Sequence, residues 1–170
     1  MYPATAYAFT IPFAGLSDGV AAALFVAVST FLLVYGMTAN TWHRLPMLAS
    51  IAFLTSVQLA QWSILITAML FLPVLAALAA VKPQAAFPVI ASSPNRAALT
   101  SALIGGLVLI GVSLVLFPSW PVEWWRIVRE TQQLRPPIMR FGGPVILLVL
   151  LRWRRPEAWL VFLMACMPQS

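Results

Sequence analysis

Charged side chains are scarce in this sequence. Lysine and arginine together number 10, aspartate and glutamate only 4, and charged residues make up 8% of the chain, whereas hydrophobic residues make up 62%. A soluble globular protein typically carries about 25% charged residues. So few charges cannot cover so much apolar surface in water, whereas lipid removes the need for an aqueous cover. The composition therefore excludes an ordinary soluble domain and indicates an integral membrane protein.

Metal-binding and nucleophilic residues are equally rare. The single cysteine, Cys166, excludes an intramolecular disulfide and a cysteine-based metal site, and the single histidine, His43, cannot form a histidine cluster. The sequence has no Gly-rich phosphate loop, no paired-histidine zinc motif and no nucleophile elbow. We therefore expect no metal ion and no cofactor.

Two uncharged runs of 21 residues each have the length of a membrane-spanning helix, which needs about 20. The first is 19–39, preceded by a candidate N-cap at Ser17-Asp18. The second is 97–117, in which Gly105-Gly106 and Gly111 allow close contact with another helix.

A third uncharged run, 46–81, has 36 residues. One straight helix of that length would be about 54 Å long, whereas the hydrocarbon core is about 30 Å thick. The chain must therefore turn back, and Gln58 and Gln61 mark the place, with at least one of these side chains inside the protein. This predicts a short span over 46–58 and a second over 61–81, kinked at Pro73.

Shorter elements follow. Residues 85–91 contain Pro88 and predict a half-helix or re-entrant piece, and 92–95 has the composition of a turn. The segment 118–140 is the only long polar connection, and positions 124, 127, 128, 131 and 134 follow helical spacing, which predicts a short amphipathic helix at the membrane surface. Residues 142–151 begin another span, and a last apolar run covers 159–167. The expected fold is all-α: a polytopic transmembrane bundle with about 5–6 membrane segments, forming a single membrane domain over 1–170.

The net charge of +6 sets topology and does not indicate nucleic-acid binding, because the basic residues lie between apolar runs, where they contact anionic headgroups. We therefore expect membrane lipid as a partner and no nucleic acid. The positive-inside rule mildly favours a cytoplasmic 152–155 loop and an exterior 120–140 segment.

Five residues are candidates for contact with a substrate: Lys82, Gln61, Arg126, Arg129 and Asp18. Each also has a structural interpretation. Asp18 is either a helix cap or a carboxylate facing a lipid-linked substrate. Arg126 and Arg129 either pair with Glu123 and Glu130 or hold a phosphate at the membrane surface. Lys82 is either a snorkelling interface lysine or a contact to lipid phosphate or a neighbouring helix.

Four short motifs occur in order along the chain: Tyr2-Pro3 with Phe9-Thr10-Ile11-Pro12, Ala60-Gln61-Trp62-Ser63, Lys82-Pro83-Gln84-Ala85-Ala86, and Pro168-Gln169-Ser170. Together they resemble glycosyltransferase family 87, membrane mannosyltransferases of the GT-C superfamily that use polyprenyl-phosphate sugars. Ala60 stands where the family has glycine. The resemblance implies a hexosyltransferase that moves a sugar from a polyprenyl-phosphate donor to an acceptor at the outer face of the inner (plasma) membrane.

The resemblance carries over no catalytic residue. In the superfamily the catalytic acid lies in the first exterior loop, and residue 1 of this chain already aligns beyond that loop. The run 159–167 also has only about nine of the roughly 20 residues that a span needs. We therefore expect the middle part of a longer enzyme, inactive alone. The alternative is a small non-enzymatic membrane protein, a transporter subunit or an assembly factor. The near absence of intramembrane charge argues against an ion-coupled transporter.

Overall fold

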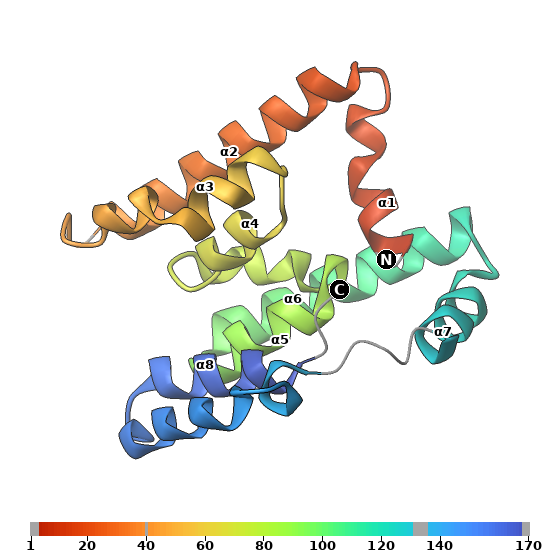
Figure 1. Cartoon of the computed structure of the whole chain (residues 1–170). Helices are drawn as coiled ribbons and strands as arrows, with labels where there is room; N and C mark the ends of the chain where they lie inside the picture. The colour runs from red at the N-terminus through yellow and green to blue at the C-terminus, as the bar shows by residue number, and fades with distance from the viewer. Residues whose placement is uncertain (1–3, 40, 131–135, 168–170) are drawn as a thin grey trace.

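The computed structural model describes residues 4–39, 41–130 and 136–167, apart from the side chain of Val128. Within these ranges the fold is all-helical and contains no strand (Figure 1). In chain order the α-helices and 3₁₀ (η) helices are α1 Ala4–Thr10, η1 Ile11–Phe13, α2 Asp18–Thr38, η2 Leu45–Ala49, α3 Ile51–Gln58, α4 Ser63–Ala68, η3 Pro73–Val81, α5 Pro83–Ser92, α6 Arg96–Leu116, α7 Trp120–Glu130, η4 Pro137–Met139, η5 Gly143–Arg152 and α8 Pro156–Cys166.

Helices α2 and α6 are long and apolar enough to cross a membrane. Each has 21 residues, and their best windows have mean hydropathies of 2.2 and 2.4. At about 1.5 Å per residue each is about 31 Å long, which matches the hydrocarbon core. Only 22% of the α2 window and 6% of the α6 window are buried inside the protein. The helices predicted over 19–39 and 97–117 are therefore confirmed to within a residue, and most of their apolar side chains face outward.

The chain reverses direction between α3 and α4, next to Gln58 and Gln61, as predicted. Ala60 adopts a positive φ of 45° in the turn after α3. The returning chain places the Ser63 hydroxyl 2.8 Å from that of Ser56. Gln58 is exposed and Gln61 is half-buried. We expected at least one of these side chains inside the protein, and neither is fully enclosed.

The spans predicted over 46–58 and 61–81 do not form as single helices. The first is divided into η2 and α3, and the second into α4 and η3. Pro73 starts η3 rather than kinking a continuous helix, because proline lacks the N–H that a helix interior needs and fits the first turn. The 3₁₀ rise of about 2.0 Å per residue makes the nine-residue η3 about 18 Å long, too short to cross. The count of 5–6 membrane segments is therefore not confirmed: within the described ranges two helices pass the length test.

The core lies around α4, which Figure 1 shows between α2 and the helices of the middle of the chain. One face of α4 contributes Leu65 and Ile66 to a buried cluster with Val81, Ala86 and Val89. The other face places Ile64 and Ala68 against Leu33 and Met37 of α2. The short helix α4 therefore joins α2 to η3 and α5.

Small residues decide how closely α6 approaches its neighbour. Helix α6 packs along η3, and a Cβ atom at Gly105 would overlap the backbone of Ala77. A Cβ at Gly106 or Gly111 would have no atom within 4 Å. Of the glycines expected to allow close helix contact, only Gly105 does so.

The C-terminal part of the described chain is a helical hairpin. The predicted half-helix 85–91 forms as α5, with Pro88 inside it. Helix α8 packs against α5 and against η5, which precedes it along the chain (Figure 1). The predicted start of a span at 142–151 is the ten-residue η5, and the last apolar run belongs to the eleven-residue α8.

Candidate functional site

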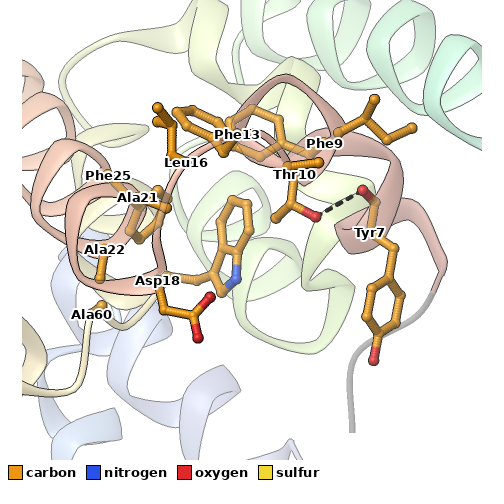
Figure 2. A pocket seen from close by; sticks show the side chains of 13 residues that line it. Tyr7, Phe9, Thr10, Phe13, Leu16, Asp18, Ala21, Ala22, Phe25 and Ala60 are labelled. Carbon is orange, nitrogen blue, oxygen red and sulfur yellow. Dashed lines mark hydrogen bonds between the residues drawn. The ribbon is translucent and has the colours of Figure 1, made fainter.

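A cavity of about 460 Å³ lies where α1, η1, the start of α2 and the turn after α3 meet (Figure 2). This volume is within the about 300–1,000 Å³ typical of small-molecule sites. The walls are apolar and aromatic, and the titratable side chains that line the cavity are those of Asp18 and Tyr7. The full lining is Tyr7, Phe9, Thr10, Ile11, Phe13, Ala14, Leu16, Asp18, Ala21, Ala22, Phe25, Ala60 and Trp62.

The Trp62 ring contacts both α1 and α2 at this cavity. The ring meets Phe9 of α1 edge-on, with centroids 5.0 Å apart and planes at 67°. It meets Phe25 of α2 at 4.9 Å and 61°. Edge-to-face pairs of this kind contribute about 0.5–1.5 kcal/mol each beyond burial. The left-handed backbone of Ala60 turns the chain so that the buried Trp62 reaches both helices.

Asp18 is the first residue of α2 and not its cap. The cap position is Ser17, with extended backbone, and its side chain makes no capping hydrogen bond. The Asp18 carboxylate therefore lies in the first helical turn, where the positive end of the helix dipole favours a negative charge. Figure 2 shows it at the opposite side of the cavity from Phe13 and Leu16. Because Asp18 is exposed, the carboxylate is also accessible to a hydroxyl donor from solvent or the headgroup layer.

A second cavity, of about 240 Å³, lies between α1 and the end of α6 with α7. Tyr7 lines this cavity as well as the first, and Trp120, Glu123 and Trp124 form its α7 side. The Nε1 atom of Trp120 is buried without a hydrogen-bond partner. Helix α1 therefore stands between a cavity with Asp18 and a cavity with Glu123.

The amphipathic helix predicted in the segment 118–140 forms as α7, at one edge of the molecule (Figure 1). Positions 131 and 134 of its predicted spacing lie outside the described residues. The expected ion pair between Glu123 and Arg126 does not form in the part of the chain that the structure describes. Instead, the Ser119 hydroxyl donates to Glu123 Oε1 over 2.7 Å, and the Arg129 guanidinium carbon lies 5.2 Å from the centroid of the Trp125 ring.

The five candidate residues lie in three separate places. Asp18 lines the larger cavity, and half-buried Gln61 sits between Ala60 and Trp62, which both line it. Lys82 is half-buried at the junction of η3 and α5, where its carbonyl oxygen accepts from Ala85 N–H and Ala86 N–H at 3.1 and 3.0 Å. Arg126 and Arg129 are exposed on α7 and do not line either cavity. Of the five candidates, therefore, only Asp18 lines the larger cavity; Gln61 is next in the chain to two of its lining residues, and the three basic candidates do not line it.

The sequence did not predict the aromatic centre of the site, Trp62. Trp62 follows the glutamine that marks the turn, and its contacts to Phe9 and Phe25 join segments far apart in the chain. A large aromatic residue next to a turn within an uncharged run is the only local signal for it.

No protein-family model, no curated protein and no solved structure matches this chain. The resemblance to glycosyltransferase family 87 is therefore still a prediction. Of its motifs, Tyr2-Pro3 and Pro168-Gln169-Ser170 lie outside the described residues. Ala60–Ser63 forms the turn beside the larger cavity, and the motif beginning at Lys82 ends η3 and starts α5.

Proposed function

We propose that this chain is a multi-pass protein of the inner (plasma) membrane that binds a polyprenyl-phosphate sugar, as its resemblance to glycosyltransferase family 87 implies. The membrane part is supported by α2 and α6, which are long, apolar and mostly unburied. Further support comes from α7, which follows α6 and carries Trp125, Arg126 and Arg129 on its exposed surface.

The larger cavity is the observation that carries the binding proposal. An isoprenoid chain is apolar and branched, and the walls of this cavity are aromatic and aliphatic. The Asp18 carboxylate would repel a phosphate, so its role is to accept a hydrogen bond from a hydroxyl of the sugar or of the acceptor. Because no lysine or arginine lines this cavity, the phosphate would have to lie outside it, where Arg126, Arg129 and Lys82 are the candidates to hold it.

A photocrosslinking experiment tests the binding proposal. A benzophenone-bearing polyprenyl phosphate is irradiated with the purified chain in nanodiscs, and the modified peptides are mapped by mass spectrometry. We expect labelling within α1 and the first turns of α2, and competition by polyprenyl-phosphate-mannose but not by phosphatidylcholine. Ala22→Trp, which fills the cavity, should abolish this labelling, whereas Ala23→Trp, on an exposed position that does not line it, should leave it unchanged. Equal labelling in both variants would contradict the proposal.

Sugar transfer by the chain alone is not expected. General acid–base catalysis needs a group within about 2.6–3.2 Å of the acceptor hydroxyl, in a setting that tunes its pKa. Asp18 is exposed, and the other titratable residue lining the same cavity is Tyr7. Incubation of the chain with polyprenyl-phosphate-mannose and a lipid acceptor should therefore give no product. Turnover that disappears in Asp18→Asn would instead identify Asp18 as the base.

One observation favours the alternative of a non-enzymatic membrane protein, such as a transporter subunit or assembly factor. Asp18, Glu123 and Glu157 line three different cavities, so these carboxylates do not converge on one site. Among the described residues no group of three histidine, cysteine, aspartate or glutamate side chains could hold a metal ion. Absence of crosslinking in the experiment above, with α2 and α6 inserted in the membrane, would support this alternative.

A further inference from the structure

A third cavity, of about 410 Å³, open at the surface and lined mostly by exposed side chains, lies between η5 and α8, apart from the site described above. One end is polar and is lined by Arg152, the last residue of η5, and by Arg155 and Glu157 at the start of α8. The other end is aliphatic and is lined by Val149, Ala158 and Val161. The cavity is therefore amphipathic, with two guanidinium groups at one end and a hydrocarbon wall at the other.

The three arginines of this turn have different positions. The guanidinium carbon of Arg154 lies 5.5 Å from the centroid of the Trp153 ring, and Arg154 does not line the cavity. Arg152 and Arg155 line it, and neither forms an ion pair with Glu157 in the described part of the chain. Two guanidinium groups and one carboxylate give the lining a formal charge of +1. A ligand that carries one negative charge balances it.

The residues around the cavity include tryptophans of the kind that are common at membrane interfaces. Trp153 and Trp159 are both exposed, and the indole N–H of Trp159 donates to the carbonyl oxygen of Trp153 over 2.8 Å. Tryptophan is enriched at the headgroup level, where its ring is apolar and its N–H is polar. Helix α8 begins with Pro156 and has no side-chain cap, so the positive end of its dipole is open at the polar end of the cavity.

We propose that this cavity binds the phosphodiester headgroup of an anionic membrane phospholipid of the phosphatidylglycerol type. Arg152 and Arg155 donate to the phosphate oxygens, because guanidinium forms paired hydrogen bonds with phosphate. Glu157 accepts from the headgroup hydroxyls, and the glycerol and upper acyl chain lie against Val149 and Val161. This site is independent of the proposed sugar-donor cavity and shares no lining residue with it.

Lipid titration of the full chain in detergent, read by native mass spectrometry, tests the site. The probes are phosphatidylglycerol and phosphatidylcholine, and inorganic phosphate serves as competitor. We expect phosphatidylglycerol to bind at least tenfold more tightly than phosphatidylcholine, and R152Q and R155Q, each made singly and also together, to weaken its binding at least tenfold. Arg154→Gln removes the same charge from the same turn outside the cavity, so it should weaken binding less than threefold. Equal effects of Arg154→Gln and either cavity arginine would overturn the proposal, because they would indicate attraction by net charge alone.

A second pair of variants leaves every charge in place and keeps the test valid if the double arginine variant aggregates. Val161→Trp fills the aliphatic end and should reduce phosphatidylglycerol binding at least tenfold. Leu151→Trp, on an exposed position that does not line the cavity, should leave binding unchanged. If Val161→Trp binds as tightly as the unchanged chain, the cavity does not hold the lipid. If inorganic phosphate displaces the lipid at equimolar concentration, the site recognises free phosphate and the lipid assignment is wrong.

Discussion

Gly105 of α6 lies so close to Ala77 of η3 that a Cβ atom at Gly105 would overlap the Ala77 carbonyl oxygen. The contact joins α6, one of the two long apolar helices, to η3, which is its main neighbour. In a lipid environment, close packing of backbones stabilises helix pairs because burial of apolar side chains there brings little gain over lipid. Helix α6 can therefore approach η3 this closely only because residue 105 is a glycine, which has no side chain.

Gly105→Val should destabilise the protein by about 2 kcal/mol, because the added side chain forces α6 away from η3. Gly106→Val is the matched control: it makes the same change one residue along the same helix, where no atom lies within 4 Å of an added Cβ. Equilibrium unfolding in mixed micelles measures both. Equal destabilisation by the two variants would show that the α6–η3 contact is wrong.

Ala60→Gly should stabilise the protein by about 0.5–1 kcal/mol. Ala60 has a φ of 45°, a left-handed conformation that costs a non-glycine residue about 1–2 kcal/mol, and the entropy of glycine in the unfolded chain offsets part of the gain. Thermal unfolding in detergent measures the change. The control, Ala23→Gly in the middle of α2, should lower stability by about 1 kcal/mol. A loss of stability at both positions would contradict a left-handed Ala60.

Thr5→Val should cost about 1 kcal/mol. The Thr5 hydroxyl donates to the Ala80 carbonyl oxygen over 2.6 Å, and this buried bond ties α1 to η3. Valine has a similar shape but leaves the carbonyl without this donor. Thr10→Val removes an exposed bond to Tyr7, only three residues away, and should change stability by less than about 0.5 kcal/mol. The same unfolding assay compares the two variants. A larger loss of stability for Thr10→Val than for Thr5→Val would contradict the contact between α1 and η3.

Cysteine accessibility tests the predicted orientation. In a Cys166→Ser background, Ser119→Cys at the exposed start of α7 should react with a membrane-impermeant maleimide in intact cells, because the charge distribution places 120–140 outside. Arg154→Cys in the opposite loop should react only after lysis. The reverse pattern would invert the topology.

Local sequence features were sufficient to predict three elements. Helices α2 and α6 form over the two uncharged runs of 21 residues, and the observed helices agree with the predicted ranges to within a residue. The Asn95 side chain accepts from Ala98 N–H over 2.7 Å and so ends the preceding turn. Amphipathic periodicity likewise predicted α7. In each case the residues that define the element are neighbours in the chain.

The break between α4 and η3 could not be predicted in the same way. Residues 61–81 contain no charge, and after Thr67 only Pro73 interrupts their apolar pattern, so periodicity favours one kinked helix. In the structure α4 ends at Ala68 and η3 begins at Pro73, and the two faces of α4 pack in different directions, one against α2 and one against η3 and α5. The continuous apolar pattern does not show which of these partners each face contacts.

The sequence by itself determined that the protein is apolar, helical and long enough to cross a membrane at α2 and α6, because the length and hydropathy of an apolar run are properties of one helix. Only the tertiary structure decided which side chains meet. Trp62 packs between Phe9 and Phe25, and Asp18 lines the cavity beside them instead of capping its helix. These contacts join residues far apart in the chain, and their positions follow from a turn at Ala60 whose backbone geometry composition does not reveal.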